Sequence, residues 1–219
     1  IDFSYEVSRA LAAVEGAILL VDATQGVEAQ TLTNIELARR QDLTIIPAIN
    51  KIDLPQARIE ETEEEMQNLL GVGREEIIRV SARTGEGVER LLEEVVRSIP
   101  PPLVQENMGA EPRALVFDFE YSLLRGVISH VRMVEGKIEK GTRLTFSASG
   151  ETFVAGECGI FRPALAPALL LEAGEIGYIV TNIKEPKVVR AGDTVVREGS
   201  SLPPLPGYEE ARPVVFSSL

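Results

Sequence analysis

Three consecutive prolines, Pro100, Pro101 and Pro102, divide the 219-residue chain into two stretches with different hydrophobic patterns. Each proline fixes its own φ angle and lacks a backbone N–H, so such a run cannot lie inside a helix or a central strand. A polar stretch follows at residues 105–109. We therefore predict a linker over residues 100–112, with one folding unit before it and another after it.

Residues 1–99 alternate short apolar runs with amphipathic segments. Continuous apolar character predicts buried strands at Gly16–Asp22, Leu43–Asn50 and Ile77–Ser81. Helical periodicity predicts helices at Ser4–Val14, Glu28–Arg40, Ile59–Leu70 and Val88–Ser98. Strands that alternate with helices form parallel crossovers, so we predict an α/β fold, a parallel sheet covered by helices. Such sheets bind their ligands in loops at the carboxyl ends of the strands.

Residues 113–200 change to apolar strands separated by glycine turns. The predicted strands are Ala114–Tyr121, Val127–Val134, Arg143–Ser147, Thr152–Ala155, Ile176–Thr181 and Asp193–Val196. Their length and spacing are typical of an all-β barrel domain. Residues 201–219 begin with a second proline-rich break and continue into the apolar stretch Pro213–Phe216. We interpret this last segment as a linker and the start of a third domain.

Charge and residue counts exclude several kinds of site. The net charge of −12 argues against non-specific nucleic-acid binding, and we predict that DNA is not a partner. The single cysteine, Cys158, excludes an internal disulfide framework and a multi-cysteine zinc site, and the single histidine, His130, excludes a site that needs two. No run of about 18 apolar residues occurs. Because the chain opens on Ile1 and not on Met, we expect it to be a piece of a longer protein or a processed product.

Asn50, Lys51 and Asp53 lie directly after the second predicted strand, where an α/β fold places its ligand. A carboxylate accepts two parallel N–H donors, which guanine supplies from N1 and its 2-amino group and adenine does not. The aliphatic stem of Lys51 can lie on the base, and Asn50 can tie neighbouring loops together. The alternative reading is a plain turn in which Asp53 caps the next helix.

Ser81, Ala82 and Arg83 follow the next predicted strand and favour the first of these readings. Small residues let backbone N–H groups approach a base and donate to the guanine O6. Gly85 and Gly87 permit a tight turn into the following helix. Two such loops after neighbouring strands predict a pocket for the guanine base of a nucleotide.

These two loops resemble the base-recognition motifs of translational GTPases. The segments Val21–Leu32 and Leu43–Asp53 are similar, more specifically, to the LepA or elongation factor 4 family. The second stretch agrees through Tyr121–Val127, Gly136–Gly141 and Ala173–Ile179. Ala191–Thr194 and the run from Leu205 to Phe216 agree as well, so the resemblance covers essentially the whole chain.

The resemblance implies a fold in two parts, a partial P-loop GTPase domain of α/β type followed by the β-barrel domain of a translation factor. It implies GTP or GDP as the nucleotide, Mg²⁺ in the full-length parent, and the ribosome as partner, in back-translocation or in ribosome biogenesis. Members are cytoplasmic or peripheral to the bacterial plasma membrane, and relatives act in mitochondria and chloroplasts. The GTP base-binding residues carried over are Asn50, Lys51, Asp53, Ser81, Ala82 and Arg83.

The chain also departs from that family pattern. It contains no Gly-x-x-x-x-Gly-Lys-Ser/Thr phosphate loop, no magnesium-binding switch Thr and no water-positioning His of the Asp-x-x-Gly-His element. Phosphoryl transfer depends on those groups, so we expect no catalytic residue or metal ligand in this chain, and neither GTP hydrolysis nor tight GTP binding. Arg83 stands where Lys is more usual. We also expect the edge of Gly16–Asp22, central in the family's sheet, to be bare and to pair with another copy.

Other readings remain open at this point. Within the ribosomal GTPases the alternatives are elongation factor G and the ribosomal protection proteins, and a non-catalytic ribosome-binding module is a further one. A receiver-type signalling domain would need acidic partners for Asp22. We interpret the acidic run Glu60–Glu65 as a solvated helix face, and His130 as a half-buried barrel residue without a catalytic role.

Overall fold

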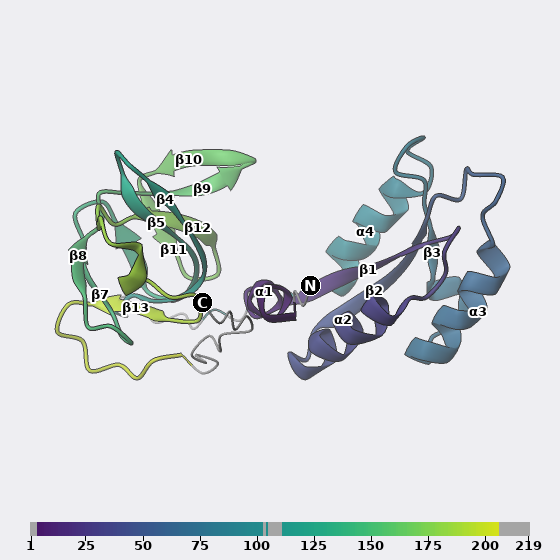
Figure 1. Ribbon diagram of the computed structural model, residues 1–219, viewed down its shortest axis with the longest axis horizontal. Coiled ribbons are helices and arrows are strands. Elements are labelled where there is room, and N and C mark those ends of the chain that lie inside the picture. The colour runs from purple at the N-terminus through teal and green to yellow at the C-terminus, as the bar shows by residue number, and fades with distance from the viewer. Residues whose placement is uncertain (1–3, 103, 105–110, 206–219) are drawn as a thin grey trace, which may run out of the picture. The chain divides into compact units, whose positions relative to one another are not determined.

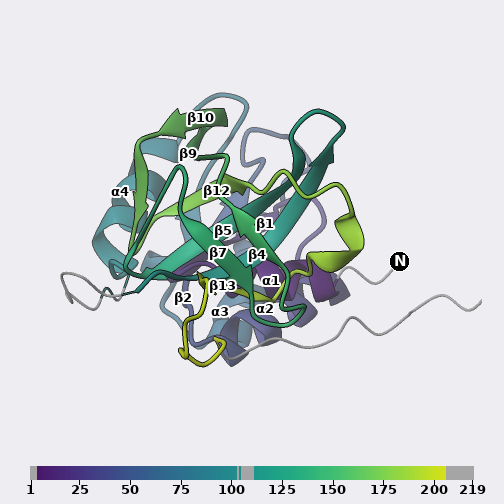
Figure 2. The same cartoon turned by 90° about the vertical axis from the view of Figure 1, so that its left-hand side faces the viewer.

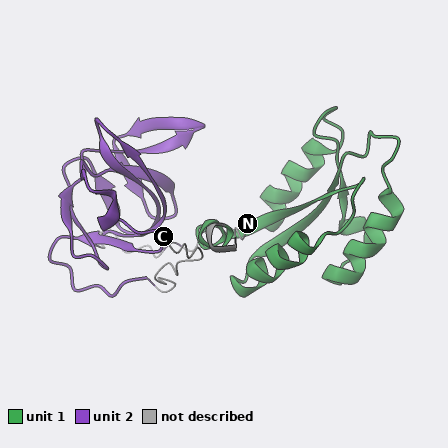
Figure 3. Cartoon of the chain, viewed as in Figure 1, with its two compact units in different colours: residues 1–102 green, residues 103–219 purple. Residues whose placement is uncertain are grey.

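The computed structural model describes residues 4–102, 104 and 111–205, so the predicted strand at Pro213–Phe216 lies outside the described residues. The chain divides into two compact units, residues 1–102 and residues 103–219 (Figure 3). Each unit is described below by itself.

Unit 1 is a three-stranded parallel sheet with helices (Figure 1). The strands are β1 (Gly16–Asp22), β2 (Thr44–Asn50) and β3 (Ile78–Arg79), in the order β1-β2-β3. The helices are α1 (Ser4–Leu11), α2 (Ala29–Arg40), α3 (Ile59–Leu70) and α4 (Val88–Ser98), with a short 3₁₀ turn η1 (Arg74–Glu76). The predicted α/β alternation is confirmed.

Helices cover both faces of this sheet because successive side chains of a strand point to opposite sides. On one face Ile49 of β2 packs with Met66 of α3, and on the other Ala48 packs with Leu91 of α4. The cover of β1 is incomplete: Val21 is buried, but Ile18 and Leu20 are 41% and 53% exposed. That strand pairs on one side only, with β2.

Parallel pairing brings the carboxyl ends of the strands to one edge of the sheet. Asp22 lies opposite Asn50 in the β1–β2 register, and Ile49 lies opposite Arg79 in the β2–β3 register. The loops that begin at residues 23, 51 and 80 therefore start side by side.

Unit 2 is an antiparallel β structure. Its strands are β4 (Arg113–Ser122), β5 (Gly126–Glu135), β6 (Lys137–Glu139), β7 (Arg143–Phe146), β8 (Thr152–Val154), β9 (Glu157–Arg162), β10 (Ala164–Ala168), β11 (Leu170–Glu172), β12 (Ile176–Val180) and β13 (Thr194–Arg197), with a 3₁₀ turn η2 (Pro186–Val188). Eight of them form one sheet in the order β10-β9-β12-β5-β4-β13-β7-β8, and β11 pairs with β6. Figures 1 and 2 show the sheet curled around its core, as the predicted barrel domain requires.

Four strands of this unit escaped prediction. Strands β6 and β11 have three residues each, too few for a visible alternation. Strand β10 contains Pro167, which is tolerated because β10 lies at the end of the sheet order, where a missing N–H costs no ladder bond. His130 is half-buried in β5, as expected, with its ring centroid 5.0 Å from that of Phe161.

The interpretation of Glu60–Glu65 as a wholly solvated face is wrong for two of its residues. Glu63 is buried, and its carboxylate accepts bonds from Arg74 and Arg79. Glu65 accepts a 2.8 Å hydrogen bond from the Val27 N–H. Glu63 lies one turn before the buried Met66 and is turned inward with it, whereas Glu65 reaches the loop after β1 from the other flank of the helix.

Two features are absent from the described part of the chain. No helix in it is both long and apolar enough to cross a membrane. No group of three or more His, Cys, Asp or Glu side chains in it is arranged to hold a metal ion.

Candidate functional site

The carboxyl edge of the unit 1 sheet gathers the residues that the sequence singled out. Asn50, Lys51 and Asp53 follow β2, and Ser81 to Arg83 follow β3. The loop after β1 lies next to them, since Ala23 donates its N–H to the Asn50 carbonyl at 2.9 Å. The loop after β3 is joined to β2 as well, since Val80 donates its N–H to the Ile49 carbonyl at 2.8 Å, so all three loops begin at fixed positions.

Asp53 and Ser81 form the buried part of this site. The Ser81 hydroxyl donates to Asp53 Oδ1 at 2.8 Å and accepts the Thr84 N–H at 3.1 Å. Ser81 is fully buried, and the Asp53 side chain is 15% exposed. Arg83, largely exposed, places Nη1 3.9 Å from Asp53 Oδ2. The hydroxyl fixes the carboxylate in one orientation, while a planar ligand with two N–H donors can still reach its acceptor positions.

Asn50 joins the two loops. Its Oδ1 accepts the Ala82 N–H at 3.0 Å across 32 residues of chain. The same N–H is one of the backbone donors expected to meet the guanine O6. For Ala82 to donate to a base, it must share or exchange its bond to Asn50.

Lys51 has a backbone conformation that is unusual for its residue type. Its φ is +66°, in the left-handed region, which residues other than glycine seldom adopt. Its Nζ lies 2.5 Å from Asp22 Oδ2 at the end of β1. That hydrogen bond, with two more from Thr24, lowers the pKa of Asp22 to about 2. The carboxylate is therefore ionised and holds the ammonium in place.

Sequence reasoning missed Asp22 and Thr24 as members of this group. The signal was present, since Asp22 ends a strand next to the one that Asn50 ends, and the register sets the two opposite each other. A search for acidic partners of Asp22, rather than a basic one, left it unassigned.

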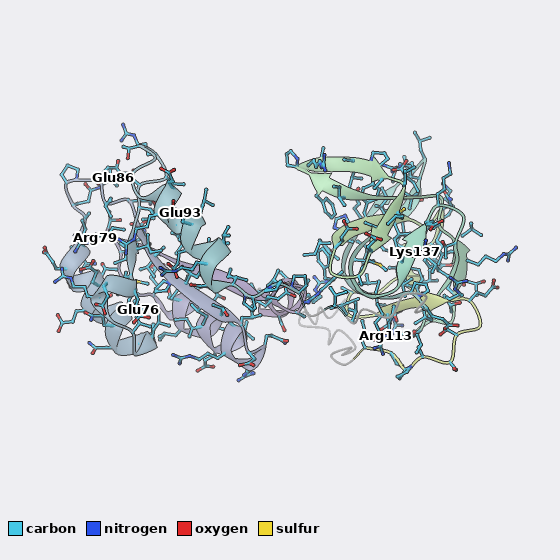
Figure 4. The ribbon with its side chains drawn as sticks, turned by 180° about the vertical axis from the view of Figure 1, so that it is seen from behind. Glu76, Arg79, Glu86, Glu93, Arg113 and Lys137 are labelled. Carbon is cyan, nitrogen blue, oxygen red and sulfur yellow. The ribbon has the colours of Figure 1, made fainter. Side chains whose placement is uncertain are left out.

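Glycines close the loop after β3 against its own strand. Ser81 donates its N–H to the Glu86 carbonyl at 2.9 Å, and Glu86 lies in that loop (Figure 4). Gly87, at φ +72°, lies so near β3 that a Cβ there would stand 2.0 Å from the Arg79 carbonyl oxygen. This position requires glycine both for its φ angle and for the close approach.

Glu63 of α3 binds two arginine side chains near the loop after β3. Arg79, which Figure 4 labels, donates Nε and Nη2 to Glu63 at 2.5 and 2.8 Å. Arg74 donates Nε to the same carboxylate at 2.5 Å. Burial would raise the pKa of Glu63, but the two guanidinium groups outweigh it and lower that pKa. Glu65 and Arg58 hold the loop after β1 through Val27 and the Gln25 carbonyl.

Comparisons with known proteins agree with this geometry. Residues 1–101 match the family model of the elongation factor Tu GTP binding domain. The chain is 48% identical, over its whole length, to elongation factor 4 of Thermotoga maritima and 47% identical to that of Desulfitobacterium hafniense. It spans 35% and 36% of these relatives, about a third of their length.

Solved structures of translation factors share the fold. The apo form of translation elongation factor SelB from Methanococcus maripaludis has a TM-score of 0.71 at 18% identity, covering 86% of this chain and 41% of SelB. A bacterial selenocysteine-specific elongation factor has a TM-score of 0.69 at 21% identity, covering 88% and 33%. At these identities the similarity concerns the fold alone. The evidence for a family relationship is the sequence match to elongation factor 4 along the whole of this chain. The chain therefore belongs to the elongation factor 4 family, spans about a third of the length of its members, and matches the GTP binding domain over residues 1–101.

Proposed function

We propose that the protein to which this chain belongs is a ribosome-dependent GTPase of the elongation factor 4 type, and that unit 1 holds the guanine base of GTP or GDP. The observation that carries the proposal is the partly buried Asp53 carboxylate, oriented by the buried Ser81 at the carboxyl edge of the sheet. In this proposal Asp53 accepts the guanine N1–H and 2-amino group. Adenine offers no matching donors, and would leave the carboxylate half-paired.

The neighbouring residues have supporting roles in the proposal. Lys51 places its stem along the base, and Asn50 holds the two loops at a fixed spacing. Ala82 and Arg83 supply backbone N–H groups toward O6. In this proposal Arg83 acts through its backbone, and its side chain is largely exposed, so we expect Arg in place of the more usual Lys to change little.

We infer that this chain by itself neither hydrolyses GTP nor binds it tightly. Its sequence contains no Gly-x-x-x-x-Gly-Lys-Ser/Thr loop, the element whose N–H groups cradle phosphates. Contacts to the phosphates and to Mg²⁺ would therefore come from residues outside this sequence. Catalysis of phosphoryl transfer resides in those contacts, so a base pocket alone provides recognition without reaction.

The proposal also includes the ribosome as partner, with back-translocation or ribosome biogenesis as the step. A cytoplasmic location with a pool bound peripherally at the bacterial plasma membrane belongs to it, and cell fractionation of the whole protein checks that point. Elongation factor G is the competing assignment. The 48% identity to elongation factor 4 over the whole chain favours the elongation factor 4 assignment.

The test of base recognition compares guanosine with inosine, which lacks the 2-amino group, by NMR titration of the 219-residue chain. The unchanged chain is expected to bind guanosine about tenfold more tightly, because inosine leaves one acceptor of Asp53 unpaired. Asp53→Asn is expected to abolish the preference, and Asp42→Asn, at an exposed turn, to leave it intact. Absence of guanosine binding, or a preference that survives Asp53→Asn, would contradict the proposal.

We also infer that copies of this chain associate through β1. Ile18 and Leu20 are exposed there, and the N–H and C=O groups of that side have no partner strand in the described sheet. Sedimentation velocity at increasing concentration should then reveal species larger than one chain, and Leu20→Lys should remove them. A single sedimenting species at every concentration would refute the association.

A further inference from the structure

Asp22 is the most tightly held ionised group at the carboxyl edge of the unit 1 sheet. Its Oδ1 accepts two hydrogen bonds from Thr24, from the backbone N–H at 2.8 Å and from the hydroxyl at 2.7 Å. Its Oδ2 accepts the Lys51 ammonium at 2.5 Å. Three donors fix the carboxylate in one orientation, so it acts as an anchor and not as a mobile surface charge.

Lys51 is strained toward this anchor by its own backbone. Left-handed φ values occur at only three non-glycine residues of the described chain, Asp42, Lys51 and Asn182. Such a conformation costs free energy for a residue with a Cβ and persists where the surroundings determine it. At Lys51 this conformation occurs together with a side chain that reaches Asp22 at the end of β1.

The pair leaves the aliphatic part of Lys51 as the useful surface. The Lys51 side chain is 49% exposed although its ammonium is bound to Asp22, so part of its stem remains accessible in the loop that also carries Asp53. The ammonium is neutralised by Asp22 and is not available as a free charge. A fixed row of methylene groups next to an oriented carboxylate suits the flat face of a purine.

We propose that Asp22 is a positioning residue of the base site, which holds the Lys51 stem as one wall against the face of the bound purine. The inference rests on the base-binding role proposed above and adds a residue to it. Without Asp22 the Lys51 side chain is free to rotate, so binding of a base must fix it in one conformation and loses affinity to that entropic cost. Because a stem contacts any purine face, Asp22 sets affinity, whereas Asp53 sets the choice between guanine and other bases.

The test uses Asp22→Asn in the 219-residue chain, with guanosine and inosine as the two probes and Asp42→Asn as the matched control. Asp22→Asn is expected to weaken the binding of both nucleosides about fivefold, the loss that freeing one long side chain produces. The ratio of the guanosine and inosine affinities should stay constant. Lys51→Met, which keeps a stem but loses the charge, should weaken binding by a similar factor. The double variant should be no weaker than either single one, because both remove one interaction.

A second readout is independent of binding. The ¹H–¹⁵N correlation of the Lys51 ammonium should be visible at neutral pH in the unchanged chain and in Asp42→Asn, and lost in Asp22→Asn. Equal affinities of the unchanged chain and Asp22→Asn, or a change in the guanosine-to-inosine ratio, would overturn the role of Asp22 alone. If the unchanged chain bound neither nucleoside, the base site and this inference would both fall.

Discussion

Replacing Glu63 by Gln tests how much of unit 1 depends on one buried carboxylate. Glu63 is 1% exposed and accepts three charge-assisted hydrogen bonds, one from Arg74 and two from Arg79. Breaking a fully buried ion pair costs about 3–5 kcal/mol. The two arginine side chains are about half exposed (51% and 45%), so they regain water when the charge is removed. Gln also keeps one acceptor, and we expect a loss of about 2 kcal/mol.

Urea unfolding followed by circular dichroism at 222 nm measures this loss. The signal reports on unit 1, since all four α-helices of the described chain lie there. A loss of about 2 kcal/mol shifts the unfolding midpoint by about 1–2 M urea. Glu64→Gln is the matched control, because Glu64 neighbours Glu63 on the same helix but is exposed, and its effect should stay within about 0.5 kcal/mol.

The effect of Glu63→Gln on the free energy of unfolding should also depend on pH, in a direction that follows from the pKa of Glu63. The pKa of Glu63 is lowered in the folded chain, so its ionised form contributes stability above the ordinary glutamate pKa. That contribution disappears as pH falls through the lowered value, where the carboxyl takes up a proton. The difference between the original chain and Glu63→Gln should therefore be constant near neutral pH and shrink in acid. A midpoint unchanged by the substitution, or a difference that grows in acid, would refute the reasoning.

Three further outcomes are expected from unfolding measurements. Gly87→Ala should lower the free energy of unfolding by more than about 2 kcal/mol, because its Cβ would meet the Arg79 carbonyl oxygen. Gly85 has a similar φ of +85° with open space around it, so Gly85→Ala should cost only about 1 kcal/mol. Equal losses would contradict this. Ser81→Ala should cost about 1–2 kcal/mol and weaken guanosine binding, since it frees the Asp53 carboxylate, and unchanged binding would separate the hydroxyl from the site. Burial raises the pKa of Asp193, so unit 2 should lose stability as pH rises through that pKa, and Asp193→Asn should flatten the dependence; an identical pH profile would exclude it.

Much of unit 1 was predictable because its signals are local. Helix α3 has the predicted bounds, Ile59–Leu70, since a proline-containing turn precedes it and Gly71 ends it in the left-handed conformation. Strand β3 is shorter than its apolar run, two residues instead of five, because the chain turns at Ser81 to bond with Glu86.

The parts that escaped prediction depend on contacts between distant residues. Glu63 looks like its acidic neighbours until Arg79, 16 residues further on, is brought beside it by the return of the chain. The Lys51–Asp22 pair spans 29 residues and needs the β1–β2 register to be visible. Sequence spacing could indicate the base-pocket candidates, because both loops follow strands, but not the side chains that orient them.

The two edges of the unit 1 sheet differ in a way that sets the stoichiometry of any self-pairing. The Ile49 carbonyl accepts a bond from the Val80 N–H, so the backbone of Pro47, two residues earlier, faces the same side of β2, the side on which β3 pairs, and offers no N–H there. With β3 only two residues long, that edge cannot template a further strand. Among the described strands of this sheet only β1 remains open, and two copies joined about a twofold axis would pair both open edges with each other. Growth would then stop at a closed pair of chains, because an extending fibre needs two different edges and this sheet presents one.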